Sequence, residues 1–130
     1  MLLLAFAWAG MLLGQQNNAK EQDPPEEDER LATREYSFNP LQAEKELKVG
    51  NYYFKKGSYR AAALRFEEAT KWDPSLAEAY KRLGEAKEKQ KDRAAAAVAY
   101  RTFLKIAPDD TEAGEIKKRL AEIQAKLLKK

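Results

Sequence analysis

The sequence predicts an all-α chain of about five helices, in which one helix–turn–helix unit occurs twice. Apolar and small residues recur every three or four positions between clear helix start and stop signals. In addition, the stretch GNYYFKKGSYRAAALRF at residues 50–66 returns in altered form as GEAKEKQKDRAAAAVAY at residues 84–100, an offset of 34 residues. A constant offset of this size indicates stacked repeats, because each unit buries its apolar face against its neighbour.

The first predicted helix begins after Asn39, which can act as an N-cap. Pro40 then occupies the first helical position, where its missing N–H costs nothing, and Gly57 ends the helix. The second helix begins at the N-cap Ser58 and ends near Trp72. These signals predict two adjacent helices joined by a tight turn.

Ser75 with Glu78 forms a predicted capping box for the third helix, which ends near Lys91. Asp92 is the predicted N-cap of the fourth helix, which Pro108 ends. Asp109 with Glu112 forms the same box before a fifth helix. Its apolar stripe consists of Ile116, Leu120, Ile123 and Leu127.

The period and the residue types resemble the tetratricopeptide repeat family, whose pattern runs W-x2-L-G-x2-Y, then A-x3-F, then P. Repeat one, residues 43–76, matches at Val49, Gly50, Tyr53, Ala62, Phe66 and Pro74, with Glu46 at the opening large position. Repeat two, residues 77–110, matches at Tyr80, Leu83, Gly84, Ala96, Tyr100 and Pro108, with Lys87 in place of the tyrosine. The resemblance implies a short α-solenoid over residues 39–130 that ends in a capping helix at residues 111–128.

The composition argues against an enzyme. The chain has no histidine and no cysteine, which removes imidazole bases, thiolate nucleophiles and the commonest zinc ligands. It contains no glycine-rich phosphate loop and no calcium loop. We therefore expect no catalysis, no cofactor and no metal site. Nucleic-acid binding is not expected either, because the net charge is only +3 and lysines and arginines alternate with glutamates.

The N-terminal region divides into two parts. Residues 1–14, MLLLAFAWAGMLLG, carry no charge and are long enough for the apolar core of a signal peptide but short for a membrane span. They predict export to the periplasm or cell envelope, or, as the alternative, membrane association through an uncleaved anchor. Residues 15–38 are polar and acidic and predict a disordered linker. Tyr36 and Phe38 are the exceptions that can pack on the domain.

The family resemblance implies that the first helix of each repeat lines a concave inner surface, so the predicted function is a protein–protein interaction scaffold. The partner would be a protein or peptide. The alternative is a structural subunit of a membrane-associated envelope or outer-membrane assembly, and a homo-oligomer is also open. The inner positions are Leu47, Lys48, Asn51, Phe54 and Lys55 in repeat one and Lys81, Arg82, Glu85, Glu88 and Lys89 in repeat two. All of them except Glu88 are predicted partner contacts.

Within this set, Leu47 and Phe54 are expected to anchor an apolar side chain while the cations steer an acidic flank. Relatives that grip a C-terminal carboxylate have a residue matching Asn51, but Leu47 and Arg82 stand here in place of the other clamp residues. A carboxylate clamp is therefore not expected. In the alternative reading, Tyr36 and its neighbour Phe38 cover the two anchors, with the acidic linker lying on the groove.

Overall fold

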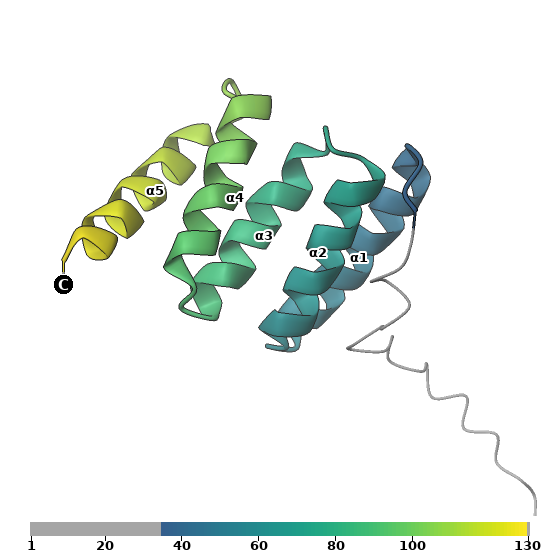
Figure 1. The fold of residues 1–130 in the computed structure, drawn as a ribbon, viewed down its shortest axis with the longest axis horizontal. Helices are drawn as coiled ribbons and strands as arrows, with labels where there is room; N and C mark the ends of the chain where they lie inside the picture. The colour runs from purple at the N-terminus through teal and green to yellow at the C-terminus, as the bar shows by residue number, and fades with distance from the viewer. Residues whose placement is uncertain (1–34, 130) are drawn as a thin grey trace, which may run out of the picture.

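The computed structural model describes residues 35–129, and within this range it contains five α-helices and no strand. Their bounds are α1 (Pro40–Lys55), α2 (Tyr59–Trp72), α3 (Ala77–Lys89), α4 (Arg93–Ile106) and α5 (Ala113–Leu128). Figure 1 shows them side by side in chain order, from α1 at one end to α5 at the other. The predicted all-α fold of helix–turn–helix repeats is confirmed.

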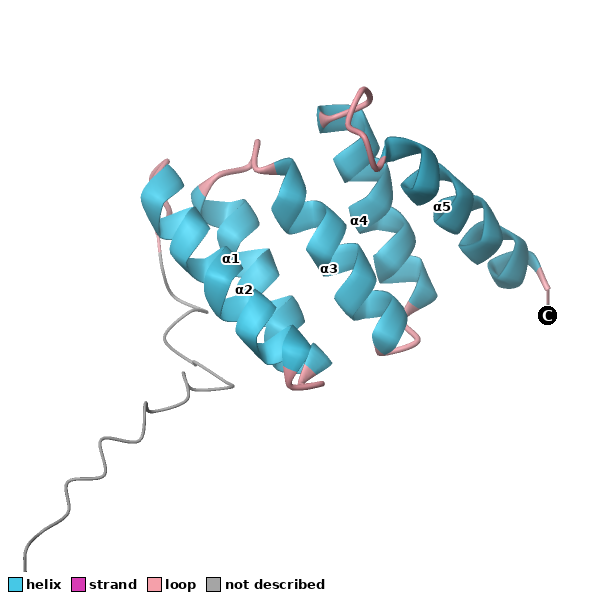
Figure 2. Cartoon of the chain, turned by 180° about the vertical axis from the view of Figure 1, so that it is seen from behind, coloured by secondary structure: helices cyan, strands magenta, loops and turns pink. Residues whose placement is uncertain are grey.

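The helices pack as two antiparallel pairs, α1 with α2 and α3 with α4, and α5 packs on α4. The first pair joins the second through the contact of α2 with α3. Helix α1 lies behind α2 in Figure 1 and in front of it in the reverse view of Figure 2. The pairs are therefore stacked side by side with one helix of each pair on each face, and the face that carries α1 and α3 is called the inner face below.

Two of the predicted N-caps are confirmed. The Asn39 side chain accepts the backbone N–H of Gln42 at 3.1 Å, and Asp92 accepts that of Ala95 at 3.2 Å. Each bond satisfies an amide that the helix itself leaves without a partner. Ser58 stands at the predicted N-cap of α2, but its side chain makes no capping bond.

The two predicted capping boxes are not formed. Ser75 donates its hydroxyl and its backbone N–H to Asp73, at 2.6 and 2.9 Å, so its side chain is occupied before α3 begins. At α5 the N–H of Glu112 is accepted by Asp110 at 2.8 Å, and no side chain caps the helix itself. In both turns an aspartate side chain accepts bonds from residues just before the helix, and these local bonds compete with helix capping. This competition explains why α3 and α5 begin later than the predicted capping boxes would place them.

An aromatic ring fills the centre of each helix pair. Phe66 in the first pair and Tyr100 in the second are fully buried. Each ring lies directly against a glycine of the preceding helix, Gly50 and Gly84 respectively. The sequence predicted this close approach of the helices from the small residues at the same offset, and the structure confirms it.

Tyr36 packs on the domain, as the sequence predicted, and it does so on α2. Its hydroxyl donates to the buried Glu68 carboxylate, at 2.8 and 2.7 Å from the two oxygens. Its ring meets the Trp72 ring edge-on with centroids 4.9 Å apart, and the N–H of Asn39 donates to the Trp72 carbonyl. Phe38, in contrast, is 71% exposed. The ordered contacts of the domain thus include Tyr36, before the first helical cap.

The predicted signal peptide or anchor at residues 1–14 lies outside the described residues, as does the predicted linker up to residue 34. Both stay predictions. Among the helices of residues 35–129, none combines the length and the apolar character needed to cross a membrane.

Candidate functional site

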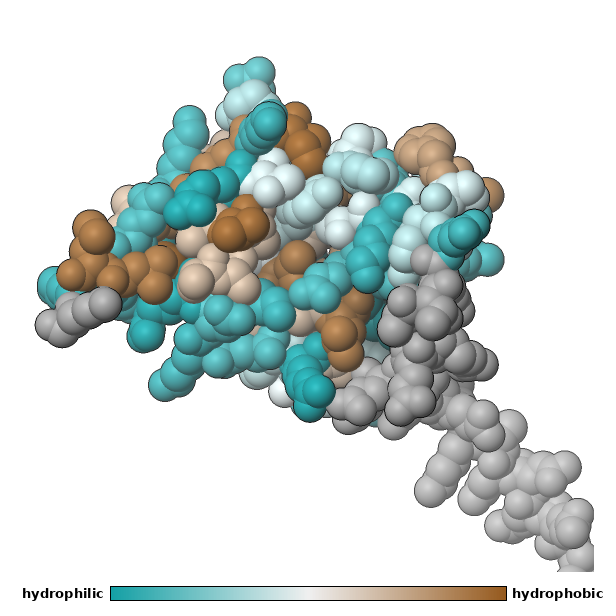
Figure 3. All heavy atoms as spheres, in the orientation of Figure 1, coloured by the Kyte–Doolittle hydropathy of each residue, from teal (hydrophilic) through white to brown (hydrophobic). Residues whose placement is uncertain are grey.

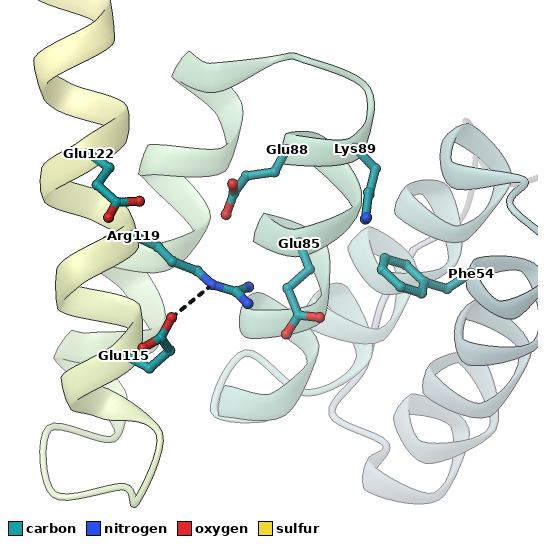
Figure 4. Close-up of a pocket in the computed structure, with 7 residues that line it drawn as sticks. All are labelled: Phe54, Glu85, Glu88, Lys89, Glu115, Arg119 and Glu122. Atoms are coloured by element: carbon teal, nitrogen blue, oxygen red, sulfur yellow. Dashed lines mark ion pairs between the residues drawn. The ribbon is translucent and has the colours of Figure 1, made fainter.

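A groove of about 550 Å³ runs across the inner face, between α1, α3 and α5. Figure 4 shows its lining: one aromatic ring from α1, and charged side chains from α3 and α5. The lining residues are Phe54, Glu85, Glu88, Lys89, Glu115, Arg119 and Glu122. The sequence prediction included Phe54, Glu85 and Lys89 as contacts, placed Glu88 on the inner surface, and missed the three residues of α5.

The lining residues keep the 34-residue offset of the repeats. Equivalent positions on the three inner helices are Asn51, Glu85 and Arg119 in one set and Phe54, Glu88 and Glu122 in the other. Helix α5 therefore contributes to the groove as the first helix of a repeat does, in addition to covering the end of the stack. Adding 34 to the predicted inner positions of repeat two would have identified the three lining residues of α5.

Arg82 ties the first two inner helices together. Its guanidinium lies 4.3 Å from the centroid of the Phe54 ring, and its Nε donates to the Asn51 side chain at 2.9 Å. The same guanidinium pairs with Glu85 at 2.7 Å. The Phe54 ring also meets Tyr59 edge-on at 5.1 Å. Arg82 thus interacts with the chain's own groove residues, whereas the sequence prediction assigned it to an acidic partner.

Leu47 and Lys81 are directed into the protein. Both residues are only 7% exposed, and Leu47 belongs to the hydrophobic core of the first helix pair. The ammonium group of Lys81 pairs with Glu78 at 2.7 Å and with Glu112 at the start of α5. Burial lowers the pKa of Lys81, but the bonds to Glu112 and Glu78 outweigh it and raise that pKa. Neither predicted contact is available to a partner in this conformation.

The remaining predicted cations on α1, Lys48 and Lys55, are exposed. The alternative in which Tyr36 and Phe38 cover the apolar anchors is wrong, because Tyr36 lies on α2 and Phe38 points into solvent. Phe54 is instead flanked by Arg82 and Tyr59.

A buried hydroxyl supports the groove wall at Glu88. Tyr100, fully buried between α3 and α4, donates its phenol O–H to the Glu88 carboxylate. Burial, and then this bond to a carboxylate, raise the pKa of Tyr100 well above its ordinary range. The phenol therefore stays protonated and remains the donor of this bond. Phe66, the equivalent residue of the first pair, has no hydroxyl and faces no carboxylate at the equivalent position, which is Phe54.

Carboxylates outnumber cations in the groove lining by four to two. Arg119 pairs with Glu115 at 3.6 Å, and the Tyr100 phenol together with nearby carboxylates raises its pKa. The ammonium group of Lys89 lies over the Tyr59 ring, 5.9 Å from the ring centroid. Within residues 35–129, no group of three or more carboxylates is arranged to hold a metal ion.

A second hollow, of about 350 Å³, lies on the opposite face between α2, α3 and α4. It is mostly apolar, and its lining includes Tyr80, Leu83 and Val98, the last 59% exposed. Figure 3 shows apolar patches among hydrophilic side chains on the molecular face of Figure 1. This hollow is smaller than the groove, and its two charged lining residues, Glu67 and Lys87, pair with each other at 3.5 Å.

Alkaline pH is expected to destabilise the domain, and less so after Tyr100→Phe. The pKa of Tyr100 is higher in the folded state than the value of about 10 in an unfolded chain. Its stabilising contribution is therefore complete below about pH 10 and is lost as the pH rises toward the folded pKa, because the unfolded state releases the proton first. Urea unfolding at about pH 8 and about pH 11 measures the loss. An equal loss in both proteins would contradict the assignment.

Two family models agree with this fold. A TPR repeat family model matches residues 50–91, and a tetratricopeptide repeat model matches residues 77–110. Among solved structures, the chain is similar to the first TPR of Spaghetti (RPAP3) bound to HSP90 peptide SRMEEVD, at 20% sequence identity over 68% of this chain and 97% of that one, with a TM-score of 0.36. No curated protein matches the sequence. The two family matches together cover residues 50–110, from within α1 to the turn after α4, and this part of the chain is similar to tetratricopeptide repeats.

Proposed function

We propose that this protein is a non-enzymatic scaffold that binds a segment of a partner protein in the groove between α1, α3 and α5. Tetratricopeptide repeats stack into solenoids whose concave surfaces are used for binding. The observation that carries the proposal is the groove itself, which offers an aromatic ring and several charged groups over about 550 Å³. A recognition groove of this kind combines an apolar anchor point with polar groups that fix orientation.

Phe54 is the proposed apolar anchor point. It is only partly buried, and the guanidinium of Arg82 and the ring of Tyr59 hold it in place. A side chain fixed in this way loses little conformational freedom when a partner binds. Leu47, which the sequence suggested as a second anchor, is buried in the hydrophobic core of the first helix pair and is not part of the proposed anchor point.

The test uses the full chain and a random peptide library displayed on phage. Peptides that bind the chain are expected to bind the Phe54→Ala variant about tenfold more weakly or worse, because an aromatic anchor is lost. Leu41→Ala is the matched control, since Leu41 is an exposed apolar residue of the same helix and does not line the groove. Far-UV circular dichroism checks that both variants are folded. Peptides that bind Phe54→Ala and the unchanged chain equally would rule out this groove.

Export to the periplasm or cell envelope remains a proposal that rests on the apolar residues 1–14 alone. The alternative role, as a structural subunit of a membrane-associated assembly, rests on the same segment. The groove favours the scaffold, because a purely structural subunit needs no hollow lined by charged groups.

A further inference from the structure

We propose that the groove selects a segment that carries lysine or arginine beside an apolar residue, rather than an acidic segment. The inference rests on the proposed function, because it specifies the chemistry of the segment that enters the same groove. A cationic group would lie between Glu88 of α3 and Glu122 of α5, and the neighbouring apolar side chain would lie against Phe54.

The two guanidinium groups at the groove already have carboxylate partners within the chain. Arg82 pairs with Glu85 and stacks on Phe54, and Arg119 pairs with Glu115. Lys89 leans toward the Tyr59 ring at the edge of the groove. Arg82 and Arg119 would bind an acidic segment only in competition with their own carboxylate partners, which leaves the exposed Lys89 as the one lining cation without an ion pair among residues 35–129.

Two carboxylates of the groove are left without a cation at salt-bridge distance among the described residues. Glu88 accepts a bond from the phenol of Tyr100, which orients the carboxylate but brings no cation to it. Glu122 makes no ion pair or hydrogen bond within residues 35–129. Figure 4 shows the two side chains extending toward each other from opposite walls. Among the described lining residues the guanidinium beside them is that of Arg119, which pairs with Glu115 and interacts with Glu88 at longer range.

This arrangement suits an ammonium or guanidinium group from a partner. A cation between two carboxylates forms charge-assisted hydrogen bonds and removes the repulsion between them. The buried Tyr100 hydroxyl fixes Glu88 before the partner arrives, so little ordering is needed there. The chain's own segment at residues 20–35 carries seven acids and three bases and is therefore a poor occupant of this end of the groove.

The test determines which peptides the full chain selects from the same random library, and how they bind to Glu88→Gln/Glu122→Gln. We expect the selected peptides to contain lysine or arginine next to an apolar residue, and to bind the double variant about tenfold more weakly, because two charge-assisted contacts are lost. Glutamine still accepts the Tyr100 bond, so the fold is retained. Glu44→Gln/Asp109→Asn is the control, since it removes two exposed negative charges outside the groove lining.

The outcomes separate this inference from the proposed function. Selected peptides that are neutral or acidic, but lose affinity with Phe54→Ala, would leave the groove function intact and overturn the choice of a cationic segment. Cationic peptides that weaken equally with the control variant would also overturn it, because general charge attraction would then explain binding. If no peptide is selected over a chain-free control, both the proposed function and the inference fail.

Discussion

Arg65→Met is expected to lower the free energy of unfolding by about 3–5 kcal/mol, because it leaves a buried carboxylate without its cation. Arg65 of α2 donates to the Glu46 carboxylate of α1 at 3.2 Å, and the two side chains are only 10% and 7% exposed. Removing the arginine leaves a carboxylate buried between two helices without this cation. The remaining bond from Gln42, at 3.0 Å, does not neutralise the charge. Urea unfolding at neutral pH measures the loss.

The double variant Glu46→Leu/Arg65→Met is the control for this prediction. Replacing both members of a buried ion pair with apolar residues of similar volume is often neutral or stabilising, because the cost of removing two charges from water is avoided. We therefore expect the double variant to recover most of the stability that Arg65→Met loses. A double variant as unstable as the single one would show that Arg65 acts through packing alone.

The ion pair between Glu46 and Arg65 is a feature of the fold that the sequence did not predict. The 34-residue offset and the helix stop signals predicted five helices and their order, because periodicity and turn chemistry are local properties of the chain. Glu46 was visible only as a mismatch, a carboxylate where the family pattern has a large apolar residue. Its partner lies 19 residues away on the next helix, and only the packed structure shows that the two side chains meet.

The candidate site was predicted to a smaller extent. Helix register placed Phe54, Glu85 and Lys89 on the inner surface correctly, since equivalent positions share a face. Register does not show which long side chain folds back on its own domain, so Arg82 and Lys81 were assigned to a partner although they pair internally. The acidic character of the groove emerged only when α5 was placed beside α3.

Gly50→Ala is expected to destabilise the domain by about 2 kcal/mol, although alanine is the better helix former. A Cβ atom at this position would lie 2.4 Å from the Phe66 Cε1 atom and 2.6 Å from its Cδ1 atom. The Phe66 ring is fully buried and cannot move aside without displacing its neighbours, so overpacking costs about 3 kcal/mol at the upper end of its usual range. The gain in helix propensity returns about 1 kcal/mol of this cost.

Gly114→Ala is the matched control, because Gly114 lies in α5 and its added Cβ would meet nothing within 4 Å. That change should stabilise the domain by about 0.4–1 kcal/mol through the smaller entropy of the unfolded chain. The two glycine substitutions therefore have opposite predicted signs, and thermal unfolding of both variants under the same conditions compares them directly. If Gly50→Ala raised the melting temperature as Gly114→Ala should, the contact between α1 and Phe66 would have to be looser than the structure shows, and the close pairing of α1 with α2 would no longer explain why the repeat keeps a glycine there.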